Sequence, residues 1–203
     1  MPSLEQSVKC QYAKVFSDSD WCLFKEMADV SLSEAAFLRK SDFKKVPHTR
    51  RLLVRNSRKR LLIGVGAELL LKAIYLKTGF CINKPQGPRA LSAPKFPFTP
   101  AAAAGVPLDG ADTYTLDKLI DKLKEIIKLQ DPAVVTDGLR IAKVFRNKEG
   151  HVVTSEHKFV PESFRAIENA LVALYADAFH EQLTVRFSLK SGEKAAWKTT
   201  QIT

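Results

Sequence analysis

Residues 61–76 read LLIGVGAELLLKAIYL and form the most apolar stretch of the chain. At helical spacing, apolar side chains surround almost the whole circumference of this segment, which is typical of a helix buried on several sides. Pro47 precedes the stretch and Gly79 follows it, so we predict one long central helix that ends just before Gly79. Gly64 and Gly66 mark either a break in this helix or a place where another helix approaches closely.

Further helices are predicted on both sides of this segment. Apolar residues recur at helical spacing over residues 116–127. The Asp-Pro pair at 131–132 is typical of a helix start, and the helix that follows reaches Gly150. The last apolar stripe covers residues 161–178. Upstream, the S-x-x-E pattern at residues 31–34 indicates a helix start within a helical N-terminal region.

Two segments depart from helical periodicity. Six of the ten prolines fall within residues 80–113, which predicts an extended surface loop. From Leu183 onward apolar and polar residues alternate, which is typical of a half-buried strand. Ser191 and Gly192 supply a turn, and the chain then returns as a second strand.

We therefore predict an all-α fold, a bundle of about four to five helices. Residues 1–46 form an N-terminal helical extension, and residues 47–182 form the bundle, with residues 80–113 as an inserted loop. Residues 183–203 form a small C-terminal β-hairpin, which must pack on the helices or on another subunit because a lone hairpin is marginally stable.

The net charge of +10 at pH 7 bears on the class of partner. Such an excess of positive charge favours polyanions, with nucleic acid as the first candidate and a merely basic surface as the alternative. No segment offers the ~20 apolar residues that cross a bilayer, so no membrane association is expected. The three unevenly spaced cysteines are typical of reduced thiols, which predicts a cytoplasmic protein.

A basic run without any acidic residue spans residues 44–60. On a helix, Arg51, Arg55 and Arg58 share one face, and Lys59 adjoins it. We expect these four side chains to contact RNA phosphates, with a solvated helix surface as the alternative. The run contains no aromatic residue that could stack on bases, so sequence-specific reading of single strands is not indicated.

The segment RNKEGH, residues 146–151, combines a guanidinium, an amide and an imidazole near the end of a predicted helix. His151 can take the proton of a ribose 2′-hydroxyl, because an unperturbed imidazole has a pKa of about 6.5. Arg146 can hold the phosphoryl oxygens through two hydrogen bonds, and Asn147 can orient the imidazole or bind a phosphate oxygen. Cleavage also needs an acid for the leaving group, which a second copy of the motif in a symmetric dimer would supply.

This segment resembles the hallmark of the HEPN superfamily, in which an arginine and a polar residue are followed by three variable residues and a histidine. Residues 66–76, GAELLLKAIYL, resemble the early helix of these proteins, and residues 114–119 resemble the start of their next helix. The resemblance implies a helical bundle and a homodimer with two motifs facing across a cleft. It also implies a metal-independent endoribonuclease, often a toxin or an effector of antiviral defence.

On this basis we predict an endoribonuclease with Arg146, Asn147 and His151 as its catalytic residues and with no cofactor. The expected partners are RNA, a second copy of the chain, and an antitoxin or regulatory protein. Glu68 and Lys72, one helical turn apart, either form an internal ion pair or bring Glu68 toward the motif to orient Arg146 or His151.

Two other functions remain open from the sequence. One is a non-catalytic dimerisation module that binds nucleic acid or a nucleotide. The other is a helical scaffold that binds protein partners through residues 80–113 or through the tail. A metal site is not expected, because Glu149, His151, Glu156 and His157 match no tight ligand spacing.

Overall fold

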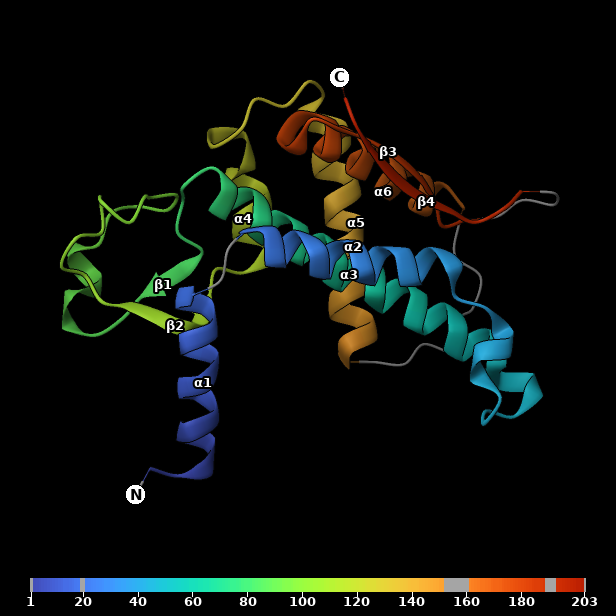
Figure 1. Ribbon diagram of the computed structural model, residues 1–203, viewed down its shortest axis with the longest axis horizontal. Helices are drawn as coiled ribbons and strands as arrows, with labels where there is room; N and C mark the ends of the chain where they lie inside the picture. The colour runs from blue at the N-terminus through green and yellow to red at the C-terminus, as the bar shows by residue number, and fades with distance from the viewer. Residues whose placement is uncertain (1, 19–20, 152–160, 189–192, 203) are drawn as a thin grey trace.

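The computed structural model describes residues 2–18, 21–151, 161–188 and 193–202, apart from the side chains of residues 12–18, 111, 150 and 151 (Figure 1). The α-helices in chain order are α1 (Leu4–Asp18), α2 (Trp21–Phe37), α3 (Arg51–Lys77), α4 (Leu116–Lys122), α5 (Pro132–His151) and α6 (Pro161–Leu174). The strands are β1 (Asn83–Pro85), β2 (Leu108–Thr113), β3 (Glu181–Arg186) and β4 (Ala196–Gln201). Short 3-10 turns η1 (Lys40–Phe43), η2 (His48–Arg50), η3 (Pro88–Ser92) and η4 (Leu123–Glu125) and the π-helical turn η5 (Tyr175–Phe179) complete the order.

Helix α3 is the centre of the molecule, as its apolar sequence predicts. It packs against α2 on one side, running in the opposite direction, and against α5, which crosses it (Figure 1). Ile63, Leu70 and Ile74 are fully buried along its length. The helix ends at Lys77, and Gly79 follows with a left-handed φ of 82°, which confirms the predicted C-terminal cap.

The two glycines within α3 mark close helix contacts, and α3 continues through both without a break. A Cβ atom placed on Gly64 would lie only 2.6 Å from the backbone nitrogen of Arg146 in α5. A Cβ atom on Gly66 would lie 2.6 Å from Cγ of Leu32 in α2. The absence of side chains at these two positions therefore allows both neighbouring helices to approach the backbone of α3.

The C-terminal half packs α5 against α6 and places a hairpin over α6. Asp131 accepts a hydrogen bond from the backbone N–H of Val134 at 3.1 Å, which caps the start of α5 as its sequence predicts. Strands β3 and β4 pair antiparallel from Glu181 opposite Gln201 to Arg186 opposite Ala196, so the predicted hairpin is present.

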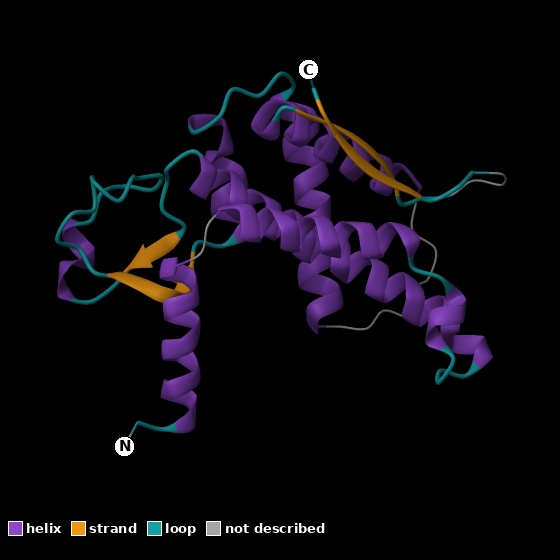
Figure 2. Ribbon diagram, viewed as in Figure 1, coloured by secondary structure: helices purple, strands orange, loops and turns teal. Residues whose placement is uncertain are grey.

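The prediction of an all-α fold is wrong. The described part of the chain contains two antiparallel two-stranded sheets, which lie on opposite sides of the central helices, one at the left and one at the upper right of Figure 2. The sheet of β1 and β2 lies inside the segment 80–113 that was predicted to be an extended loop. This segment also packs its own apolar side chains, since Phe96 and Phe98 are buried and the Phe96 ring stacks on Tyr75 of α3. Its prolines prevent helix but permit a short sheet at the edge of the core.

Two smaller differences concern where helices begin and end. Helix α2 runs through the S-x-x-E pattern at residues 31–34, where Ser31 donates to the carbonyl of Met27 at 2.9 Å instead of capping a new helix. The helix predicted over 116–127 is shorter, since α4 tightens into η4 after Lys122.

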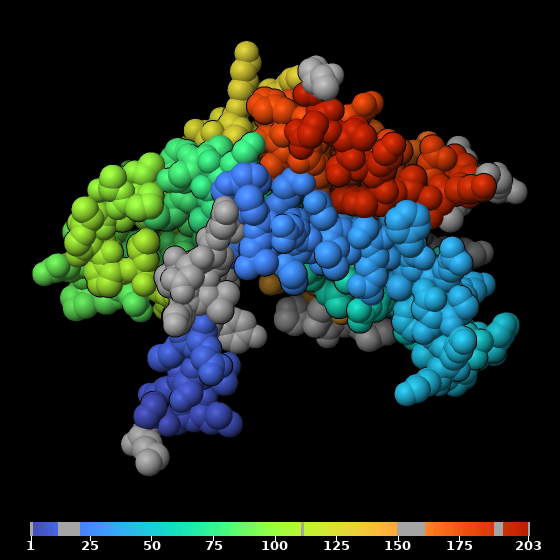
Figure 3. All heavy atoms as spheres, viewed as in Figure 1, coloured from blue at the N-terminus to red at the C-terminus, as the bar shows by residue number. Residues whose placement is uncertain are grey.

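Helix α1 lies against β2 and stands out from the rest of the molecule (Figure 3). No helix in the described part of the chain combines the length and the apolar character required to cross a membrane.

Candidate functional site

One face of α3 carries a charged residue or a glycine at every fourth position where it meets α5. This face consists of Arg60, Gly64, Glu68 and Lys72. Gly64 receives the backbone of Arg146, and Arg60 pairs with Glu149, so the two helices are antiparallel along this contact. Residues 146–149 are therefore anchored to the central helix through both backbone and side-chain contacts.

The guanidinium of Arg146 is held by Glu68. Its Nε lies 3.0 Å from Oε2 of Glu68, and its Nη1 donates to Oδ1 of Asn147 at 3.2 Å. The other carboxylate oxygen of Glu68 lies 3.0 Å from Nζ of Lys72. Glu68 thus forms the expected ion pair with Lys72 and also contacts Arg146, so the two interpretations of Glu68 in the sequence are compatible. Glu68 is 15% exposed, whereas Arg146 is 43% exposed and accessible to a ligand.

Arg146 and Asn147 line a pocket of about 370 Å³, which we call the motif pocket. Its other lining residues come from α3, β1, β2, α4 and α5: Glu68, Lys84, Asp112, Thr113, Tyr114, Thr115, Leu116, Asp117 and Lys143. Together with Arg146, the pocket is lined by three cations and three carboxylates, and Lys84 pairs with Asp112 and Lys143 with Asp117. The charges around Arg146 are therefore nearly balanced.

The structure brings together four of the five residues predicted for the catalytic motif and its support, namely Arg146, Asn147, Glu68 and Lys72. The fifth, His151, is the last residue of α5, but its side chain lies outside the described part of the chain. Glu156 and His157 lie outside it as well. Among the residues that are described, no group of three or more His, Cys, Asp or Glu is arranged to hold a metal ion.

Glu149 has a structural role that the sequence did not reveal. Its Oε1 lies 2.5 Å from Nε of Arg60, and its Oε2 accepts a short hydrogen bond from the hydroxyl of Ser57. The side chains of Arg60 and Glu149 are only 1% and 3% exposed. This buried pair fixes the motif segment to α3. The spacing of four between Arg60, Gly64, Glu68 and Lys72 was the signal that could have indicated a polar contact face.

The four basic residues expected to form one RNA-binding face are in different environments. Arg51 donates to the carbonyls of Val46 and Lys44. Arg58 pairs with Glu34 of α2 at 3.0 Å. Lys59 is buried, and its Nζ donates to the carbonyl of Phe187 at 2.8 Å. No single exposed stripe results, because α2 and the end of β3 cover parts of this face.

Arg55 and Lys59 instead line a second, larger cavity of about 1070 Å³, which we call the basic hollow. Burial and, to a smaller extent, the nearby charge of Arg55 lower the pKa of Lys59 to about 8, although the charge of Glu168 opposes this change. Burial also lowers the pKa of Arg55. Sequence reasoning found these two residues but missed the hollow, because its other walls come from distant parts of the chain.

Comparison of the chain with known protein families, with curated proteins and with solved structures found no match.

Proposed function

We propose that this protein is a metal-independent endoribonuclease in which Arg146, Asn147 and His151 act on an RNA phosphodiester. The observation that supports the proposal best is the position of Arg146, held through Nε by Glu68 and still 43% exposed at the motif pocket. A guanidinium has five N–H donors, so pairing at Nε and at Asn147 leaves donors for phosphoryl oxygens. The resemblance of residues 146–151 to the HEPN motif adds the imidazole of His151.

The chemistry follows from these groups. His151 takes the proton of the 2′-hydroxyl, the 2′-oxygen attacks phosphorus, and the bond from phosphorus to the 5′-oxygen breaks. Arg146 stabilises the negative charge that develops on the phosphoryl oxygens. The 5′-oxygen receives a proton from a second copy of the motif in a homodimer, which leaves a 2′,3′-cyclic phosphate and a 5′-hydroxyl.

RNA cleavage by the full chain in the presence of EDTA tests the proposal. Wild-type protein should create new 5′-hydroxyl ends, and Arg146→Ala and His151→Ala should each reduce the rate by about 10²-fold or more. Arg140→Ala is the matched control, since Arg140 also lies on α5, is 61% exposed and pairs with Asp121 at 3.6 Å. Cleavage at the wild-type rate by both motif variants would refute the assignment.

Non-catalytic binding of nucleic acid is the second candidate, and the balanced charges of the motif pocket count against cleavage there. A pocket whose cations are mostly paired concentrates phosphate weakly, so the cations of the basic hollow would bind the RNA instead. If the protein only binds nucleic acid, its affinity for RNA should weaken steeply as the salt concentration rises, and no new 5′-hydroxyl ends should form. The cleavage assay therefore separates the two candidates.

A further inference from the structure

Six Lys and Arg side chains line the basic hollow, away from the motif pocket. Among the described residues, none lines both cavities. The cations that line the hollow are Arg39, Lys40, Arg55, Lys59, Arg60 and Lys194. Among the described residues that line it, Glu193 is the single carboxylate. Arg60 is paired with Glu149, so five other cations and one carboxylate give the hollow an excess of positive charge, which the motif pocket lacks.

Two of these cations are partly or largely buried and contact neutral acceptors. Arg55 donates from Nη2 to Oδ1 of Asn56 at 2.7 Å, and Lys59 donates to the carbonyl of Phe187. Within the described ranges, neither has a carboxylate within 4.0 Å, the limit for an ion pair. Burial lowers the pKa of both side chains, and at Lys59 the charge of Glu168 offsets this lowering only in part. A bound oxyanion would add negative charge beside both cations.

Aromatic rings from three distant elements line the same hollow. They are Phe37 at the end of α2, Phe164 in α6 and Phe187 after β3. Phe37 is 49% exposed, so its ring is accessible to a ligand in the hollow. The sequence of the basic run had indicated no stacking partner, and the fold supplies the exposed ring of Phe37 from elsewhere, whereas Phe187 is only 2% exposed and Phe164 packs on Phe145. Cations that follow a phosphate backbone, together with rings that stack on unpaired bases, are typical of sites for single-stranded nucleic acid.

We propose that the basic hollow binds a segment of single-stranded RNA, with phosphates at Lys40, Arg55 and Lys194 and a base against Phe37. The inference rests on the proposed function for the choice of RNA, but it concerns a site separate from the motif pocket. Cavities of roughly 300–1,000 Å³ hold one small ligand, so a volume of about 1070 Å³ has room for at least one nucleotide of the strand. Duplex RNA fits less well, because its bases are paired and cannot stack on Phe37.

The hollow also adjoins the motif through α3. Arg60 lines the hollow and pairs with Glu149, three residues beyond Arg146 on α5. A strand in the hollow is thereby bound next to the helix that carries the motif. The hollow would anchor the substrate, while the motif pocket acts on a phosphodiester elsewhere along the same strand.

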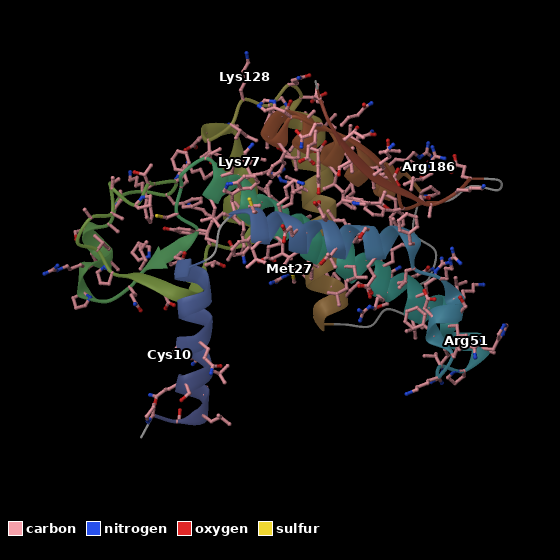
Figure 4. The ribbon with its side chains drawn as sticks, viewed as in Figure 1. Cys10, Met27, Arg51, Lys77, Lys128 and Arg186 are labelled. Carbon is pink, nitrogen blue, oxygen red and sulfur yellow. The ribbon has the colours of Figure 1, made fainter. Side chains whose placement is uncertain are left out.

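Binding of a short, labelled 2′-O-methyl oligonucleotide, measured by fluorescence anisotropy over a range of salt concentrations, tests this inference. The 2′-O-methyl group prevents attack by the 2′-oxygen, so binding is observed without cleavage. The variants are Lys40→Glu with Lys194→Glu, and Phe37→Ala, all at exposed positions. The control is Lys124→Glu with Lys128→Glu, which changes the net charge by the same amount. Both lysines are exposed and neither lines the hollow. Figure 4 shows Lys128 far from Arg51, the first residue of α3.

The hollow double variant should reduce the slope of log Kd against log salt by about 1.4, or about 0.7 for each lost phosphate contact. Phe37→Ala should weaken binding about 5- to 100-fold, and should leave binding of a duplex of the same sequence unchanged. The control should bind within about twofold of wild type at moderate salt, because it keeps the local contacts. A hollow variant that matches the control, or Phe37→Ala that binds like wild type, would overturn the inference.

The two proposals fail separately. If Arg146→Ala abolishes cleavage while the hollow variants bind normally, the inference falls and the proposed function stands. If the hollow variants bind weakly while Arg146→Ala cleaves at the wild-type rate, the proposed function falls and the RNA-binding hollow stands.

Discussion

Replacement of Glu149 by glutamine removes one charge from the buried ion pair inside the motif segment. Arg60 and Glu149 are 1% and 3% exposed, so the guanidinium would lose its carboxylate partner where little water can replace it. Ser57 would also lose its charged acceptor. Breaking a buried pair in this way costs about 3–5 kcal/mol, which is large against a typical total stability of about 5–15 kcal/mol.

Removal of both charges should cost much less. Arg60→Met combined with Glu149→Leu leaves no buried charge, and such replacements are often neutral or stabilising by about 1–4 kcal/mol. The hydroxyl of Ser57 then lacks its acceptor, which offsets this gain by about 1 kcal/mol or more. The free energies of unfolding come from urea titrations followed by circular dichroism and extrapolated linearly to water.

A surface pair provides the control. Arg165 and Glu162 lie 2.7 Å apart on α6 and are 49% and 69% exposed, so Glu162→Gln should change the free energy of unfolding by at most about 0.5 kcal/mol. A loss for Glu149→Gln no greater than that for Glu162→Gln would refute the reasoning, because it would mean that solvent reaches the guanidinium of Arg60.

Three further predictions concern the motif, the hollow and the assembly. Glu68→Gln removes the charge that holds Nε of Arg146, so kcat for RNA cleavage should fall about 10-fold or more with a smaller change in KM; an unchanged kcat would contradict a positioning role. The pKa of Lys59 is lowered to about 8 from 10.5, so between about pH 8 and 10 the unfolded chain holds a proton that the folded chain has released. The unfolding free energy of wild type should therefore rise relative to that of Lys59→Met by up to about 1.4 kcal/mol per pH unit in this window, and a difference independent of pH would count against the burial of this cation. Equal amounts of wild type and His151→Ala, after exchange of subunits, should retain about one quarter of the wild-type activity if two motifs form one site, whereas about one half would indicate independent sites.

The helices could be predicted because their signals are local. The apolar run of residues 61–76 spans several helical turns, so its periodicity identifies α3. The Asp-Pro pair at 131–132 identifies the start of α5. Alternation also identified the β3–β4 hairpin, whose strands are near in sequence. The β1–β2 sheet could not be found in this way. Asn83 pairs with Thr113 across thirty residues of proline-rich chain, and LDGADT in β2 lacks apolar alternation.

The candidate site shows the same division between local and distant information. Arg146 and Asn147 are neighbours in sequence, and Glu68 and Lys72 are one helical turn apart, so both pairs could be predicted. Periodicity also placed Arg55 and Arg58 on one helix face, but it could not show that Glu34 pairs with Arg58 or that Phe187 covers Lys59. Such contacts depend on how α2, α6 and the hairpin pack together, which no local pattern specifies.

The contact between Gly64 and the backbone of Arg146 has a consequence for recognising relatives of this protein. Any larger residue at position 64 would separate α3 from α5 and move the arginine away from Glu68. An arginine and a histidine five positions apart occur often by chance. A search that also requires a glycine four residues before a glutamate in the preceding long helix would select chains whose two helices can touch, and would discard most accidental matches.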